Sequence, residues 1–105
     1  VAETTYLHGG TPVMVPADSP FIQAASHAFE GAFRQRPARV REGASIPITA
    51  VFQEALNAPA ILVGYGLNSD DIHSPDEKFK VAHFFGGIDC NIRMYEAFSK
   101  VSTAG

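Results

Sequence analysis

Apolar residues recur at helical spacing in three stretches of the chain, and each stretch carries a start or stop signal. Residues 18–20 (Asp-Ser-Pro) are typical of a helix start, because a short polar side chain can cap the free amides and proline suits the first turn. Pro37 disfavours helix just before it, so this helix should end near Arg34. The predicted helices cover about residues 20–35, 45–56 and 81–100. Their phenylalanines are expected in the core: Phe21, Phe29, Phe33, Phe84, Phe85 and Phe98.

Two short extended stretches separate these helices, at residues 38–41 and 60–63. The second (Ala-Ile-Leu-Val) is typical of a strand buried on both faces of a parallel sheet. Alternation of helices and strands favours an α/β fold, and specifically a partial three-layer α/β/α sandwich with a mainly parallel sheet. Two strands cannot protect their own edges, so we expect the N-terminal part of a longer parent chain, or a second copy, to complete the sheet.

Composition excludes several classes of function. With 46% hydrophobic and 18% charged residues, the 105-residue chain is predicted to form one globular unit. A net charge of −3, with one small arginine group at 34–41, does not support nucleic-acid binding. No apolar run approaches the ~20 residues that span a membrane. Cys90 is the only cysteine and has no histidine at catalytic spacing, so we expect a structural thiol and a cytoplasmic location.

A polar loop at residues 70–77 contains His73, whose imidazole is a candidate metal ligand with carboxylates nearby. The alternative is purely structural, because residues 74–77 (Ser-Pro-Asp-Glu) read as a capping box that starts a helix and needs no ligand. A catalytic zinc needs about three protein ligands. The other histidines lie on separate segments, so this chain is not expected to complete a metal site by itself.

A second candidate site is the turn at residues 41–47, which opens the second predicted helix. Free amide groups at a helix N-terminus, a hydroxyl from Ser45 and the guanidinium of Arg41 would suit a carboxylate or phosphate. The alternative is a plain strand-to-helix turn that Ser45 caps. The residues leave both possibilities open.

Taken together and in order, these motifs resemble the C-terminal catalytic segment of the carnosine dipeptidase, aminoacylase and carboxypeptidase-G family of di-zinc metallopeptidases. The resemblance is carried by residues 12–14, 18–21, 41–47 (Arg-Glu-Gly-Ala-Ser-Ile-Pro), 52–54 (Phe-Gln-Glu), 61–64 and 72–77 (Ile-His-Ser-Pro-Asp-Glu). It implies that His73 is the family's last zinc-binding histidine and that Glu77 supports its loop. It also implies that Gly43, Ala44 and Ser45 hold the free carboxylate of the substrate, with Arg41 at the basic position of that motif.

The resemblance further implies a single C-terminal segment of a metallopeptidase at residues 1–105, in which residues 1–16 end the connection from a lid domain. The intact enzyme would bind two zinc ions and cleave a small peptide or an N-acyl amino acid. The resemblance matches no residue of this chain to the family's bridging aspartate or general-base glutamate, so we expect the chain to be inactive without the missing N-terminal catalytic segment. The alternative is a non-enzymatic α/β module that binds a small carboxylate ligand or self-associates as a homo-oligomer.

Overall fold

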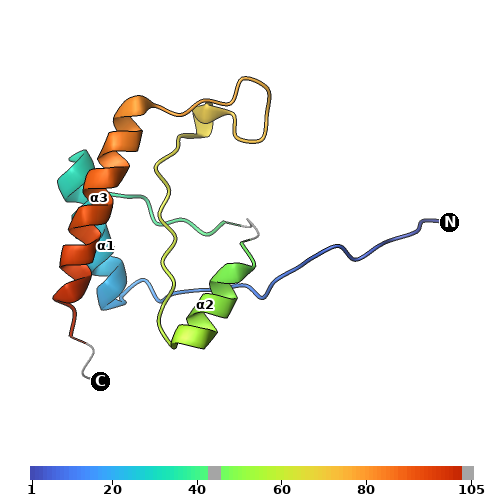
Figure 1. Cartoon of the computed structure of the whole chain (residues 1–105), viewed down its shortest axis with the longest axis horizontal. Coiled ribbons are helices and arrows are strands. Elements are labelled where there is room, and N and C mark those ends of the chain that lie inside the picture. The colour runs from blue at the N-terminus through green and yellow to red at the C-terminus, as the bar shows by residue number, and fades with distance from the viewer. Residues whose placement is uncertain (43–45, 103–105) are drawn as a thin grey trace.

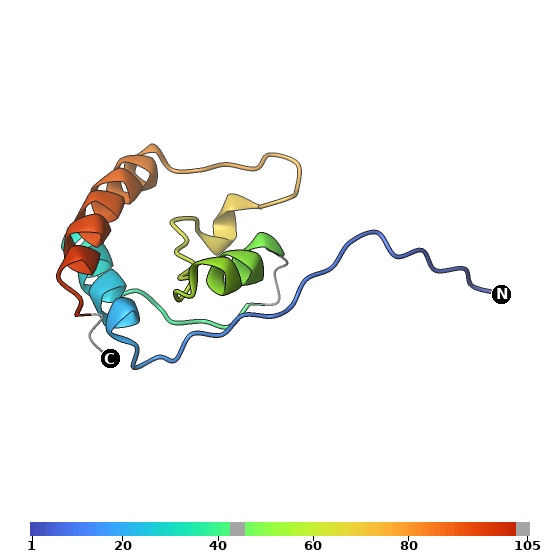
Figure 2. The same ribbon diagram turned by 60° about the horizontal axis from the view of Figure 1, so that its bottom comes forward.

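The three predicted helices are present in the computed structural model, which describes residues 1–42 and 46–102. Helices α1 and α3 lie side by side and run in opposite directions, while α2 stands apart from them (Figures 1 and 2). None of the helices in the described ranges is long and apolar enough to cross a bilayer. In chain order the elements are α1 (Pro20–Phe33), α2 (Ile48–Leu56), the 3₁₀ turn η1 (Asn68–Asp70) and α3 (Val81–Ser99).

Local sequence signals fix the ends of the first two helices. Pro20 occupies the first turn of α1, as predicted, and Arg34 ends it in a left-handed conformation with φ 56°. The Arg34 N–H donates to the carbonyl oxygen of Glu30 at 2.9 Å. Asn57 ends α2 in the same way, with φ 48°. A proline follows each cap within three residues and prevents the helix from resuming. The expected start of α2 at Ser45 lies outside the described residues.

The core lies between α1 and α3 and is small. Its fully buried apolar members are two alanines from α1 (Ala25 and Ala28) and two sulfur-containing residues from α3 (Cys90 and Met94). Half-buried side chains surround them, from both helices and from the segment before η1. They are Phe29, Ala32, Phe33, Ile61, Val63, Tyr65 and Phe98.

Two glycines in α3 let aromatic rings approach the helix backbone. A Cβ atom at Gly86 would lie 2.6 Å from the ring of Phe33, and one at Gly87 would lie 2.8 Å from the ring of Tyr65. These rings also stack on each other, with centroids 5.7 Å apart. Because real Cβ contacts are never that short, the glycines are required for this packing.

The expected strands at residues 38–41 and 60–63 are extended but form no hydrogen-bonded ladder within the described ranges. A strand joins a sheet only when an adjacent extended segment offers N–H and C=O groups for hydrogen bonds, and no other described segment offers them here. Burial nevertheless alternates as in a strand: Ile61 and Val63 face the helices, while Leu62 is 66% exposed. The α/β/α sandwich therefore stays a prediction.

The molecule is thin and exposes an unusually large surface. Its principal extents are 56 × 39 × 18 Å and its radius of gyration is 16.5 Å, against about 13 Å for a compact chain of this length. Its accessible surface is 8756 Å², whereas a compact protein of this mass exposes roughly 5,700 Å². The chain thus forms a layer rather than a closed globule.

The capping-box prediction at residues 74–77 is wrong, because no helix starts there. Residues 71–80 form turns and extended chain, and α3 begins only at Val81. The Lys78 N–H donates to the carbonyl oxygen of Asp70 at 2.9 Å. This bond folds the segment back on itself, and Asp76 adopts a left-handed φ of 63°. Both features are incompatible with a first helical turn.

The prediction that the phenylalanines lie in the core is wrong for two of them, since Phe84 and Phe85 are 58% and 63% exposed. They belong to a second apolar stripe of α3, on the side opposite the face that packs on α1. We call this stripe the outer face of α3. It comprises Val81, Phe84, Phe85, Ile88, Ile92 and Tyr95, all of them exposed.

Candidate functional site

Residues 71–77 form a loop between η1 and α3, which we call the His73 loop (Figure 1). Every residue in it is exposed, His73 included. Three of its residues have left-handed backbones: Asp71 with φ 54°, His73 with φ 62° and Asp76 with φ 63°. Aspartate and histidine tolerate this conformation better than most residues, but it still costs energy. The surrounding structure must therefore hold the loop in shape.

Asp70 supplies that support at the base of the loop. Its carboxyl oxygen Oδ2 accepts the Leu67 N–H at 2.8 Å. Its own N–H donates to the Leu67 carbonyl oxygen at 3.0 Å, and its carbonyl oxygen accepts the Lys78 N–H at 2.9 Å. One residue thus connects the chain that enters the loop with the chain that leaves it.

Asp70 is also the most deeply buried polar residue of the described ranges, with 1% of its surface exposed. Its second carboxyl oxygen, Oδ1, is buried and has no hydrogen-bond partner among the described residues. A buried polar atom without a partner costs about 1–3 kcal/mol. Sequence reasoning missed this residue, because the burial of one aspartate in a run of polar residues leaves no signal in a single sequence.

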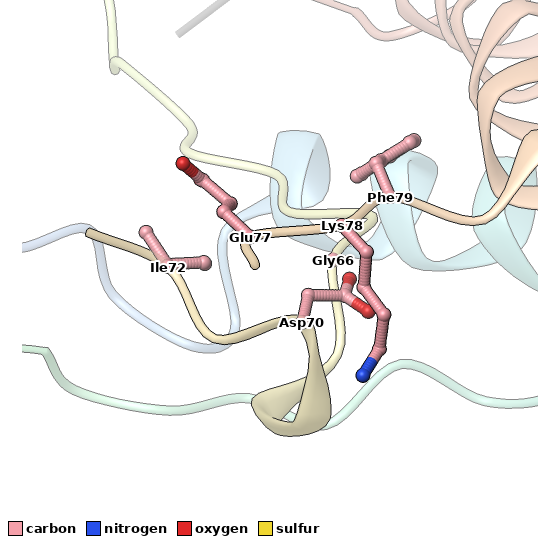
Figure 3. A pocket seen from close by; sticks show the side chains of 6 residues that line it. All are labelled: Gly66, Asp70, Ile72, Glu77, Lys78 and Phe79. Carbon is pink, nitrogen blue, oxygen red and sulfur yellow. The ribbon is translucent and has the colours of Figure 1, made fainter. Parts of the chain in front are cut away.

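An open pocket of about 420 Å³ lies beside Asp70. In Figure 3 the side chain of Lys78 runs alongside the Asp70 carboxyl group, and the carboxyl group of Glu77 points away from it. The Lys78 Nζ lies 3.9 Å from Asp71 Oδ2, in an exposed ion pair of little energetic value. The expected role of Glu77 in supporting the loop stays a prediction. The pocket is lined by Gly66, Asp70, Ile72, Glu77, Lys78 and Phe79.

A complete metal centre does not fit the described residues, which contain no group of three or more His, Cys, Asp or Glu side chains able to hold an ion. The exposed imidazole of His73 can supply one ligand, short of the three that a catalytic zinc needs. His83 is engaged elsewhere, since its Nδ1 lies 2.9 Å from the Tyr65 carbonyl oxygen. Any further ligands must come from outside the described residues.

The predicted carboxylate-binding turn cannot be placed, because Gly43, Ala44 and Ser45 lie outside the described residues. Arg41 directly precedes them and is exposed. Within the described ranges, no hydrogen bond or ion pair joins Arg41 to the His73 loop. Its neighbour Arg39 is structural, because its guanidinium donates to the Ala17 carbonyl oxygen at 2.8 Å. The substrate-binding roles of residues 41–45 therefore stay predictions.

Cys90 is a buried structural thiol, as predicted, with none of its surface exposed. Burial raises the pKa of the Cys90 thiol, so it stays protonated and is a poor nucleophile. Burial also raises the pKa of Tyr65, whose hydroxyl donates to Asn91 Oδ1 at 2.7 Å. Both groups belong to the core between the helices and the segment before η1.

Comparison with known proteins shows what this loop and helix pair are similar to. The chain is 38% identical over 86 residues to the Cys-Gly metallodipeptidase DUG1 of Saccharomyces cerevisiae, covering 81% of the chain and 18% of that protein. It is 31% identical over 98 residues to the human Beta-Ala-His dipeptidase, covering 93% of the chain and 18% of that protein. The chain therefore spans less than one fifth of the length of these relatives.

A solved structure agrees with these matches. The S. cerevisiae di-peptidase Dug1p superimposes with a TM-score of 0.79 at 32% identity, over 88% of this chain and 19% of that one. The family model for Peptidase family M20/M25/M40 matches residues 1–97. The resemblance to carnosine dipeptidase-like metallopeptidases is thereby confirmed, and the chain belongs to Peptidase family M20/M25/M40.

Proposed function

We propose that this chain is the C-terminal portion of a zinc-dependent dipeptidase or amidohydrolase that cleaves a small peptide or an N-acyl amino acid. The observation that carries the proposal is the match of residues 1–97 to one peptidase family, with two relatives named as dipeptidases. The cytoplasmic location stays a prediction. We further propose that the chain is inactive without the rest of the catalytic domain.

The surface of the chain supports this dependence on a further segment. The thin shape and the roughly 3,000 Å² of surface beyond that of a compact protein match the area buried in a permanent interface. The outer face of α3 and the exposed Leu62 would lie within that area. A strand laid beside residues 60–63 would also begin the sheet that the sequence predicts.

Within the assembled enzyme, His73 would contribute one neutral imidazole to a metal whose other ligands lie outside this chain. The turn at Gly43, Ala44 and Ser45, with Arg41 before it, would hold the terminal carboxylate of the substrate. Anchoring that group orients the scissile amide and lowers the entropic part of the barrier. No residue of this chain is assigned to proton transfer or to attack.

Complementation tests the proposal. A family relative such as the yeast dipeptidase would be produced without its C-terminal fifth and then mixed with this chain. We expect neither piece alone to hydrolyse a dipeptide, the mixture with zinc to do so, and His73→Ala to lower that activity at least 100-fold. His27→Ala, which removes an exposed histidine from α1, is the matched control. Full hydrolysis by this chain alone would refute the dependence on a further segment.

A non-enzymatic module that self-associates is the second candidate, and the outer face of α3 is the feature that favours it. Two copies could cover each other's outer faces. Light scattering separates the two cases: a stable dimer that excludes the complementing segment supports self-association. A monomer that joins the segment supports the enzyme.

A further inference from the structure

Asp70 has no part in the proposed function, yet it is the most deeply buried polar residue in the described ranges. Its neighbour Asp71 gives the contrast, because that side chain is exposed and meets only Lys78 Nζ at 3.9 Å. Buried polar atoms almost always have partners, so the unpartnered Oδ1 of Asp70 needs an explanation.

The hydrogen bonds that Asp70 does make suggest what its burial serves. The Lys78 N–H donates to the Asp70 carbonyl oxygen across the base of the His73 loop and closes it, while the bonds between Asp70 and Leu67 hold Asp70 in the turn that precedes the loop. Within the loop, the Ser74 N–H donates to the Asp71 carbonyl oxygen at 3.0 Å and forms a tight turn around His73. His73 itself is exposed and left-handed, and no side-chain hydrogen bond or aromatic contact within the described ranges involves its ring. Its direction is set by the closure of the loop.

We propose that Asp70 is a positioning residue that closes the His73 loop and thereby fixes the direction of the His73 imidazole. This inference rests on the proposed function, in which that imidazole binds a metal. A metal-binding side chain whose co-ligands come from another part of an enzyme must be held in a fixed orientation. Residues around the site usually provide that orientation through packing and hydrogen bonds. Burying Asp70 costs free energy, and in return the two ends of the His73 loop are held together.

Nuclear magnetic resonance on the whole chain tests the proposal without any enzyme assay. Asp70→Ala removes the acceptor of the Leu67 N–H, Asp70→Asn keeps an oxygen acceptor, and Asp71→Asn is the matched control that removes an exposed carboxyl group. Amide hydrogen exchange would be read at Lys78, whose own acceptor is a backbone oxygen that no variant alters. Zinc chloride alone would be titrated and read at the His73 ring protons.

We expect Asp70→Ala to accelerate amide exchange at Lys78 at least tenfold. Asp70→Asn should restore the exchange rate to within threefold, and Asp71→Asn should change it by no more than twofold. Amides of α1 and α3 should keep their exchange rates, which separates positioning from general unfolding.

Unchanged exchange at Lys78 in Asp70→Ala would overturn the proposal, as would an equal acceleration throughout α1 and α3. If the His73 ring protons of the unaltered chain did not shift on addition of zinc chloride, that result would instead refute the zinc-binding role of His73 in the proposed function. In that case exchange at Lys78 would still decide whether Asp70 closes the loop.

Discussion

The α1–α3 pair and the region formed by α2 and the His73 loop differ in burial, because apolar side chains are buried between the paired helices but not in α2 or in the loop. All four buried apolar residues lie in the pair, whereas the one buried residue of α2 is Thr49. Ile48, Val51, Phe52 and Leu56 of α2 are exposed, and so is every residue from 71 to 80. The facing sides of α1 and α3 therefore cover each other, whereas the apolar side chains of the second region, which holds His73, stay exposed like the outer face of α3.

This difference locates stability and function in separate places. The helix pair contains the groups whose loss should unfold the chain. The second region contains the candidate site, and its exposed apolar side chains, like the outer face of α3, are available to the proposed partner. Matched substitutions in the two regions can test whether stability depends on the helix pair and function on the second region.

The largest contrast is expected from truncation of one apolar side chain in each region. Met94→Ala should lower the free energy of unfolding by about 2–5 kcal/mol, because it leaves a cavity in the core of the pair. Leu56→Ala, at a residue that is 71% exposed, should change it by less than about 0.5 kcal/mol. Urea unfolding followed by circular dichroism measures both, and equal losses would remove the distinction between the regions.

A smaller contrast is expected from added bulk at two glycines. Gly87→Val would drive a side chain into the Tyr65 ring and should cost about 1–3 kcal/mol. Gly64→Val is the control, since nothing lies within 4 Å of a Cβ atom there. Thermal unfolding compares them. If Gly87→Val were neutral, close approach of the ring would not be what holds residues 60–67 on the helices.

Alkaline pH should weaken the pair through Cys90. Burial raises the folded-state pKa of this thiol above its unfolded value, so the folded state retains the proton longer. The stability is complete below the unfolded pKa of about 8.5 and falls as the pH rises from there toward the folded pKa. Urea midpoints between pH 7 and 10 measure the slope. A Cys90→Ala chain with the same slope would exclude the thiol as its source.

The smallest effect is expected from an ion pair on the solvent side of α3. A hydrogen bond from Lys100 Nζ to Glu96 Oε1, at 2.7 Å, lowers the pKa of the Glu96 carboxyl group. The contribution is present above the unfolded pKa of Glu96 and is lost as the pH falls through the lower folded value. Glu96→Gln should leave the thermal midpoint unchanged at 0.5 M salt, where exposed charges are screened. A clear drop at that salt concentration would contradict this expectation.

Helix positions could be predicted because their signals are local. Pro20 and the prolines after α1 and α2 act through the backbone of adjacent residues. In the structure α1 begins at Pro20, and both helices end shortly before the prolines that follow them. The Ser74 capping box was equally local but failed, because a bond from Lys78 to Asp70 competes with it. That bond joins residues eight apart and leaves no periodic pattern.

The candidate site was only partly predictable. His73 was identified as a candidate ligand through its motif, and it is exposed in the structure, but its role as a metal ligand stays a prediction. Asp70 was missed, since its burial depends on how residues 66 and 79 fold around it. Phe84 and Phe85, on the exposed outer face of α3, were assigned to the core because a sequence pattern identifies an apolar face without identifying what covers it.

The unpaired extended segment at residues 60–63 has a practical consequence. Apart from the Ala60 N–H, which donates to Gln53 Oε1 at 3.2 Å, the described ranges show no backbone hydrogen bond for this hydrophobic stretch, which includes the exposed Leu62. Such an edge is a template for amyloid-like stacking whenever many copies meet. The chain produced by itself should therefore aggregate more readily than the chain produced together with a polypeptide that pairs with this edge.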